Sequence, residues 1–194
     1  MTTSHSSESE LRKRLFAKGK PFIRPYQHER DAWVLWAAYD LGAFRFLGEG
    51  LQAEEFHRAL YAYSARAGMA GLWLIEDDSK HFRGGRGPVC LVGIKSDGWR
   101  IEPHFEWFKW ASPRIVLRGY VIFFQKVRFA KDVGVCLVRT VRRYVSTFHH
   151  LRRYGVLYYV GKIPNGYPND DEFDFTVKGK LQLSETVEQE KEAA

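Results

Sequence analysis

The chain has 194 residues, 45% of them hydrophobic and 27% charged, and a formal net charge of +7. This length favours one domain with a well-buried core, and the charged fraction is that of a water-soluble globular protein. No run approaches the roughly 20 uninterrupted apolar residues of a membrane helix, and the N-terminus is polar. We therefore expect a cytoplasmic protein that has no membrane partner.

The cysteines and the charge distribution give the first local expectations. Cys90 and Cys136 each lie inside an apolar run, which favours buried thiols over a disulfide or a reactive group. Between Asp132 and Asp170 there is no acidic residue, while residues 139–153 are rich in arginine. We expect a positive field there that would suit an anionic partner such as nucleic acid, although most basic helix faces are simply solvated.

The N-terminal quarter predicts an arm, a strand and a helix. Residues 1–20 are polar and then basic, with too few apolar positions to pack, so we expect a flexible arm. Residues 21–26 read as a short edge strand, because sheet edges tolerate proline. Asp31 can cap a helix that carries an aromatic stripe on one side. The positions of the stripe are Trp33, Trp36, Ala37, Asp40, Leu41 and Phe44.

The middle of the chain predicts a helix and three strands. The helix runs from about Ala53 to Ala67, with Gly68 available to end it. Two apolar runs, at 71–75 and 89–94, are expected strands. The Asp-Gly pair at 97–98 is a strong turn signal, so the second of these strands should form a hairpin with a strand from about Trp99 to Trp110.

The first of the remaining elements is a helix with a strong N-terminal signal. Ser112 followed by Pro113 predicts an N-cap with proline at the first helical position, and the helix should reach about Phe129. Glutamates dominate residues 181–194, which we expect to be a solvated acidic tail. The other predictions are strands at 133–138, 156–160 and 173–177 and a helix at 142–154.

The order of these elements, β-α-α-β-β-β-α-β-α-β-β, and several local runs resemble one known family. The runs are Ile23–Tyr26, Gly98–His104, Trp107–Arg114, Tyr154–Leu157 and Val160–Pro164. Over residues 21–180 the chain is similar to the GNAT acetyltransferase superfamily, and within it to GNAT-like proteins of tailed bacteriophages. The resemblance implies an α/β (α+β) domain with a central mixed, mostly antiparallel sheet and helices on both faces.

The resemblance also implies acetyl-coenzyme A (acetyl-CoA) as cofactor, with its pyrophosphate where the central strand enters the next helix. Members of the superfamily usually carry an Arg or Gln and a glycine-containing run at this place, whose backbone N–H groups hold the phosphates. Here Pro113 supplies no N–H, and the nearby Gly119 lies inside the helix. The residues that remain for the cofactor are Trp110, Ser112, Arg114 and Arg118.

The sharpest catalytic signal is a row of titratable residues on the central strand. Side chains alternate along a strand, so Glu102, His104 and Glu106 should share one face. The resemblance implies a glutamate on this strand as the general base, with Glu106 the first choice and Glu102 the second. The competing interpretation is a solvated or purely structural face. A metal site is not expected, because this spacing spreads the ligands over roughly 14 Å.

The resemblance further implies a tyrosine that donates a proton to the departing thiolate. Tyr154 and Tyr144 are the candidates, and Tyr154 can equally be a packing residue at its helix end. Two functions remain open. One is an N-acetyltransferase acting on an amine-bearing small molecule or protein. The other is a non-catalytic protein that lacks the cofactor loop and binds virion proteins or another anionic partner, in the host cytoplasm or the virion.

Overall fold

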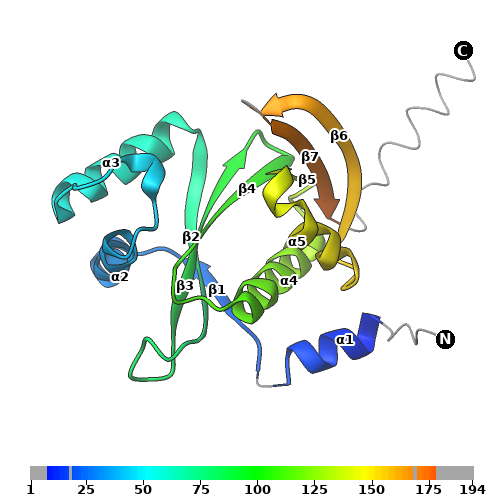
Figure 1. Ribbon diagram of the computed structural model, residues 1–194, viewed down its shortest axis with the longest axis horizontal. Helices are drawn as coiled ribbons and strands as arrows, with labels where there is room; N and C mark the ends of the chain where they lie inside the picture. The colour runs from blue at the N-terminus through cyan, green and yellow to red at the C-terminus, as the bar shows by residue number, and fades with distance from the viewer. Residues whose placement is uncertain (1–7, 18, 168–169, 178–194) are drawn as a thin grey trace, which may run out of the picture. The chain divides into compact units, whose positions relative to one another are not determined.

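The computed structural model describes residues 8–17, 19–167 and 170–177 (Figure 1). The expected acidic tail at 181–194 lies outside these residues. The helices are α1 (Glu8–Leu15), α2 (His28–Asp40), the short η1 (Arg45–Leu47), α3 (Ala53–Arg66), α4 (Pro113–Phe129) and α5 (Arg142–Arg152). The strands are β1 (Phe22–Pro25), β2 (Met69–Asp78), β3 (Arg86–Ser96), β4 (Arg100–Trp107), β5 (Val135–Val141), β6 (Leu157–Tyr167) and β7 (Asp170–Val177).

The described chain divides into two compact units that interleave along the sequence. Unit 1 comprises the described residues of Met1–Gly19, Asp97–Glu102 and Tyr120–Ala194, and unit 2 comprises Lys20–Ser96 and Pro103–Gly119. Strand β4 and helix α4 therefore each contribute to both units. The single domain expected over 21–180 stays a prediction from the sequence.

The seven strands follow the order β1-β2-β3-β4-β5-β7-β6. Of the pairings described, only β4 with β5 is parallel, and that ladder joins Arg100 to Val135 and Ile101 to Cys136. The expected fold class is confirmed: an α/β protein with a mixed, mostly antiparallel sheet flanked by helices. The short strand β1 lies at one end of this order, as the prolines at 21 and 25 of the predicted segment indicated.

Unit 2 is built on β1, β2, β3 and the second half of β4. Ile75 of β2 lies opposite Ile23 of β1 and opposite Cys90 of β3, and a bulge follows between Ile75 and Glu76. Helices α2 and α3 pack an aromatic and aliphatic core against these strands. Its members are Val34, Leu35, Ala38, Tyr39, Ala43, Phe44, Phe56, Leu60, Leu74, Leu91 and Phe108.

Helix α2 differs from its prediction in both its start and its buried face. It begins at His28 after the N-cap Gln27, and Asp31 accepts a hydrogen bond from the Gln27 N–H (2.9 Å) from inside the first turns. The expected aromatic stripe does not form the buried face, because Trp33 is 60% exposed. Residues 32–39 are all apolar, so a second set of positions satisfies the same spacing. That set, which is buried, is Val34, Leu35, Ala38 and Tyr39.

Unit 1 contains β5, β6 and β7 with helix α5, which begins at residue 142 as predicted and ends at Arg152, two residues before the predicted end. Phe148 and Leu151 point inward as expected, and Gly155 follows α5 with a left-handed φ of 62°. Both β6 and β7 extend beyond the predicted runs, because each supports the other in an antiparallel ladder from Leu157–Val177 to Tyr167–Asp170.

The expected flexible arm is replaced by helix α1 over Glu8–Leu15. Leu15 is buried within unit 1, and the Arg12 side chain donates a hydrogen bond to the Tyr154 carbonyl oxygen (2.8 Å). Arg12 also pairs with Glu8 one turn away (2.8 Å). One apolar side chain and two hydrogen bonds from Arg12 to the Tyr154 carbonyl place this helix, and neither contact has a periodic signature in the sequence.

Two other predictions, the start of helix α4 and the burial of both cysteines, are confirmed. Helix α4 begins at Pro113, and the Ile115 N–H donates to the Ser112 hydroxyl (3.4 Å). Cys90 and Cys136 are fully buried free thiols. No helix in the described part of the chain is both long and apolar enough to cross a membrane.

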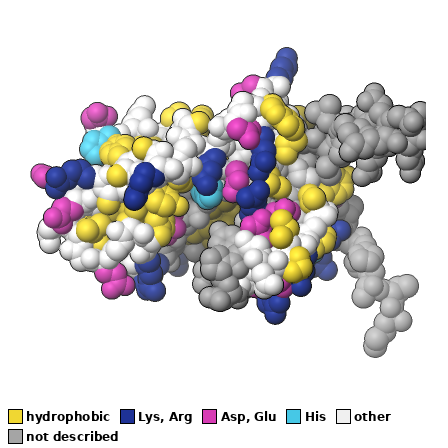
Figure 2. All heavy atoms as spheres, turned by 90° about the horizontal axis from the view of Figure 1, so that it is seen from above, with side chains coloured by type: hydrophobic (Ala, Val, Ile, Leu, Met, Phe, Trp, Pro, Cys, Tyr) yellow, Lys and Arg dark blue, Asp and Glu magenta, His cyan; other side chains and the backbone are white. Residues whose placement is uncertain are grey.

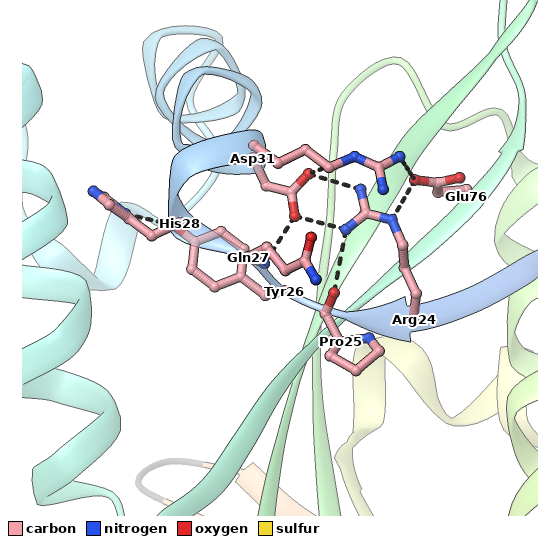
Figure 3. A network of polar contacts seen from close by, with 8 residues as sticks. Arg24, Pro25, Tyr26, Gln27, His28, Asp31 and Glu76 are labelled. Atoms are coloured by element: carbon pink, nitrogen blue, oxygen red, sulfur yellow. Dashed lines mark hydrogen bonds and ion pairs between the residues drawn. The ribbon is translucent and has the colours of Figure 1, made fainter.

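A buried ion-pair network joins β1, α2 and β2 in unit 2 (Figure 3). The Arg24 guanidinium contacts both oxygens of Asp31 (2.6 and 2.7 Å) and one oxygen of Glu76 (2.6 Å). The side chains of Arg24 and Asp31 are 10% and 3% exposed. A guanidinium that holds two carboxylates in a site closed to water fixes the angle at which α2 leaves the sheet edge.

Replacing Arg24 should therefore be costly. Arg24→Met leaves two carboxylates buried without their cation, and we expect the free energy of unfolding to fall by about 3–5 kcal/mol. Urea denaturation followed by circular dichroism measures this. Arg30→Met is the matched control, because Arg30 is exposed and lies 3.8 Å from the same carboxylates; its cost should stay within about 1 kcal/mol. Equal costs would contradict the structural role of the network.

Candidate active site

The second half of β4 presents two different faces within unit 2. The rings of Phe105 and Trp107 stack on one face (5° between planes, centroids 6.2 Å apart), so Glu106 between them points to the other. Trp107 lies beneath α4, where a Cβ on Gly119 would collide with its ring. Gly119 is thus needed for close packing of helix on strand, and it forms no part of a phosphate loop.

Glu106 is the best-defined catalytic candidate of unit 2. Its Oε1 atom accepts a hydrogen bond from the Phe44 backbone N–H (2.8 Å). Burial raises the pKa of its carboxyl above the ordinary value of 4.5, and the Phe44 N–H opposes this by favouring the charged form. The carboxylate also lies close enough to Cys90 of β3 to help raise the pKa of that buried thiol, after burial itself.

The loop that delivers the Phe44 N–H has an unusual backbone. Phe44 has a left-handed φ of 58°, which is rare for a bulky residue, and its ring is fully buried. Tyr39 holds the same loop: its hydroxyl donates to the Gly48 carbonyl (3.0 Å) and accepts from the Leu51 N–H (2.9 Å). Tyr39 therefore holds the segment that follows Phe44, and this supports the contact between Phe44 and Glu106.

The other residues of the predicted row have different surroundings. His104 is half-buried in unit 2, on the same strand as Glu106. Glu102 belongs to unit 1, where it lies 3.9 Å from Arg100 and contributes to raising the pKa of Asp174, behind burial. Glu102 and Glu106 lie on the same strand, but Glu102 belongs to unit 1 and Glu106 to unit 2.

The tyrosine candidates belong to unit 1. Tyr154 is 7% exposed, its ring lies 5.8 Å from that of His150, and its carbonyl holds helix α1 through Arg12. Tyr144 is half exposed on α5. These contacts agree with Tyr154 being a packing residue at its helix end. A role for Tyr154 as proton donor stays a prediction.

The start of α4 offers exposed polar groups but no glycine cradle. Ser112 and Arg114 are exposed, as is Lys109 just before them. Trp110 is half-buried, and its indole N–H donates to the Pro88 carbonyl (2.8 Å). The first turn of a long helix concentrates partial positive charge here, and the nearby cations add to it.

Arg118 lies in an environment different from the one the sequence led us to expect. Its side chain is 5% exposed and pairs with Asp77 of β2 (2.9 Å), whose side chain is 1% exposed. Burial raises the pKa of the Asp77 carboxyl, while the Asp78 N–H and Arg118 oppose this. A guanidinium committed to a buried carboxylate is not an exposed phosphate ligand, because the pair would have to break first.

Two of the arginines in residues 139–153, where we expected a positive field, form ion pairs with acidic residues within unit 1. Strand β7 pairs with β5 and β6, and its acidic residues meet the cations of those neighbours. The ion pairs are Arg139–Glu172 (3.5 Å), Arg142–Asp171 (2.7 Å) and Lys162–Asp171 (2.8 Å). On the face seen in Figure 2, lysine and arginine side chains lie among acidic ones and do not gather into one basic patch. Nucleic-acid binding by that segment stays a prediction from the sequence.

Sequence reasoning missed two participants in these sites, the backbone of Phe44 and the carboxylate of Asp77. Phe44 acts through its backbone, and a left-handed phenylalanine has no sequence signature. Asp77 and Arg118 lie on different elements, so their pairing follows from tertiary structure alone. The one available signal was the glycine-rich connection around Gly42 and Gly48, which marks a loop with special backbone angles.

Comparison with known proteins identifies the fold. No family model matches this chain, and no curated protein does. Among solved structures, the spermidine N-acetyltransferase of Vibrio cholerae in complex with CoA and spermine superposes with a TM-score of 0.56 at 10% identity, over 83% of this chain and 97% of that one. A probable acetyltransferase of the GNAT family from Chromobacterium violaceum gives 0.58 at 17% identity, over 82% and 83%. The chain thus has the fold of GNAT acetyltransferases.

The raised pKa of Glu106 predicts a pH-dependent stability. Between the ordinary glutamate pKa and the raised one, the folded state binds more protons than the unfolded state, so the free energy of unfolding falls as pH rises. In Glu106→Gln the side-chain amide oxygen can still accept the hydrogen bond from the Phe44 N–H, but the side chain no longer binds or releases a proton.

The stability of the wild type relative to Glu106→Gln should therefore decrease from about pH 4 upward and level off above the raised pKa. Urea unfolding at a series of pH values measures this difference. Glu49→Gln, at an exposed residue of unit 2, is the matched control. A constant difference between wild type and Glu106→Gln would show that the pKa of Glu106 is not raised.

Proposed function

We propose that this protein transfers an acetyl group from acetyl-CoA to the amine of a small molecule or protein. The observation that carries the proposal is the Glu106 carboxyl, half-buried on β4 with a raised pKa and one oxygen held by the Phe44 N–H. A carboxylate in this state is a suitable general base, because its pKa lies closer to neutrality than that of an exposed glutamate.

The role of Glu106 follows from its geometry. Oε1 is fixed by the Phe44 N–H, which orients the carboxylate and leaves Oε2 to receive a proton from the ammonium or amine of the acceptor. Acetyl-CoA, when bound, supplies the thioester carbonyl carbon that the amine nitrogen attacks. The leaving sulfur needs a proton, for which the family resemblance implies Tyr154; that residue belongs to unit 1, and its role is a proposal from the sequence alone. Positioning of the amine beside this base supplies the rest of the rate enhancement.

The residues at the start of α4 fit the diphosphate of the cofactor through side-chain charge. Lys109 and Arg114 are exposed cations, and Ser112 is an exposed hydroxyl at the N-terminal end of the helix. Trp110 provides an aromatic wall beside them. Arg118 is excluded from this set by its ion pair with Asp77. We therefore assign diphosphate contacts to Lys109, Ser112 and Arg114.

A second candidate function follows from the missing glycine cradle. Pro113 offers no N–H, and Gly119 is needed where it stands because the Trp107 ring leaves no room for a side chain. A GNAT fold without cofactor binding would act as a non-catalytic binding or structural component. The resemblance to phage-encoded proteins makes a virion protein the proposed partner in that case, with the virion or the host cytoplasm as location.

Calorimetric titration with acetyl-CoA decides between the two candidates. The enzyme proposal predicts micromolar binding, weakened about tenfold in Arg114→Ala because a charge-assisted hydrogen bond to phosphate is lost. Arg58→Ala is the matched control, since Arg58 is an exposed cation of α3 in the same unit, and it should bind as the wild type does. No detectable heat of binding with folded wild-type protein would end the enzyme proposal and leave the non-catalytic one.

A further inference from the structure

The loop between β2 and β3 lies against the start of α4. It comprises residues 79–85 and projects beyond one end of the two strands in unit 2 (Figure 1). The imidazole of His81 lies flat on the indole of Trp110, with 2° between the ring planes and 4.2 Å between centroids. Trp110 precedes the first residue of α4 by three positions, so this stack brings the loop beside the proposed diphosphate contacts.

Hydrogen bonds inside the loop fix its shape before any ligand binds. The Ser79 N–H donates to the Gly85 carbonyl (2.9 Å), and the Gly85 N–H donates to the Phe82 carbonyl (2.8 Å). The His81 N–H donates to the Ser79 hydroxyl (3.3 Å). Gly85 has a left-handed φ of 69°, which closes the turn. A ligand would therefore meet a formed loop and pay little ordering entropy.

Packing between aromatic side chains holds the loop in place. Phe82 packs edge-on against Trp110 (5.9 Å) and against Trp33 of α2 (6.2 Å). Its ring also occupies the space next to Gly87, where a Cβ would collide with it. Phe82 is thus the anchor and half-buried, whereas His81 is exposed. One face of the imidazole covers Trp110, so the opposite face is the one that meets solvent.

The same loop carries exposed positive charge. Lys80 and Arg83 flank the aromatic pair in sequence, and both side chains are exposed. The acidic neighbours are Asp77, which is buried against Arg118, and the exposed Asp78. The loop therefore keeps a net positive charge and adds two cations to Lys109 and Arg114 at the start of α4.

The geometry points to a nucleotide subsite on this loop: the exposed face of His81 stacks on an adenine ring, and Lys80 and Arg83 contact the attached phosphates. The inference rests on the proposed function, because it assigns the loop to the adenine nucleotide end of acetyl-CoA. It explains how a GNAT fold without a glycine cradle would hold a diphosphate, through side chains of a second loop. A single stacking platform fits one nucleotide, whereas a nucleic-acid strand needs successive platforms.

Titration with ADP and, separately, with acetyl-CoA tests the subsite. The variants are His81→Ala, His81→Phe and the double variant Lys80→Ala/Arg83→Ala, with Arg58→Ala as the matched control. We expect His81→Ala and the double variant to weaken binding of both ligands about tenfold. His81→Phe preserves the stacking face and should retain binding. A circular dichroism spectrum of each variant verifies folding.

The outcomes separate this inference from the proposed function. Acetyl-CoA binding that is unchanged in the loop variants would overturn the subsite and leave the acetyltransferase proposal standing. ADP binding that depends on the loop, without any binding of acetyl-CoA, would support the subsite and end the enzyme proposal. No binding of ADP to the wild type, or tighter loop-dependent binding of a single-stranded oligonucleotide than of ADP, would overturn the nucleotide subsite.

Discussion

The hydrogen bond from the Phe44 N–H to Glu106 is the constraint on which the proposed site depends. It ties a left-handed loop residue to a half-buried carboxyl on the central strand, and each end supports the other. Without the N–H, the carboxylate would lose its one described hydrogen-bond donor in a poorly hydrated place. Without the carboxylate, the strained Phe44 backbone would lose a bond that offsets its cost. A base whose pKa is raised by burial and whose orientation is fixed by the loop follows from this single contact.

Two buried guanidinium groups shape what surrounds that contact. Arg24 binds Asp31 and Glu76 and sets the position of α2, the helix that leads into the Phe44 loop. Arg118 binds Asp77 and holds α4 on the strands. Because Arg118 is committed to this pair, the cations left for a phosphate ligand are the exposed ones at the start of α4 and on the loop between β2 and β3. Burial thus separates the arginines that hold the fold together from those proposed to bind a ligand.

Local signals in the sequence predicted most elements and the fold class. Ser112 with Pro113, Gly68 and Gly155 marked helix ends correctly, because capping chemistry depends on adjacent residues only. The buried face of α2 could not be read from spacing, since residues 32–39 are all apolar and fit more than one pattern. The ion pairs of Arg139 and Arg142 could not be predicted either, because their acidic partners come from β7, a strand further along the chain. Glu106 was found from strand alternation, whereas Phe44 and Asp77 required the tertiary structure.

The central claim is that Glu106 acts as a base with a raised pKa, and the pH dependence of kcat/KM for acetyl transfer tests it most directly. For the wild type, kcat/KM should fall on the acid side with a midpoint above 4.5, the ordinary glutamate value, because protonated Glu106 cannot accept a proton. In Glu106→Gln this acid limb should be absent and the plateau lower by about 10²-fold or more. An acid limb that persists unchanged in Glu106→Gln would contradict the account.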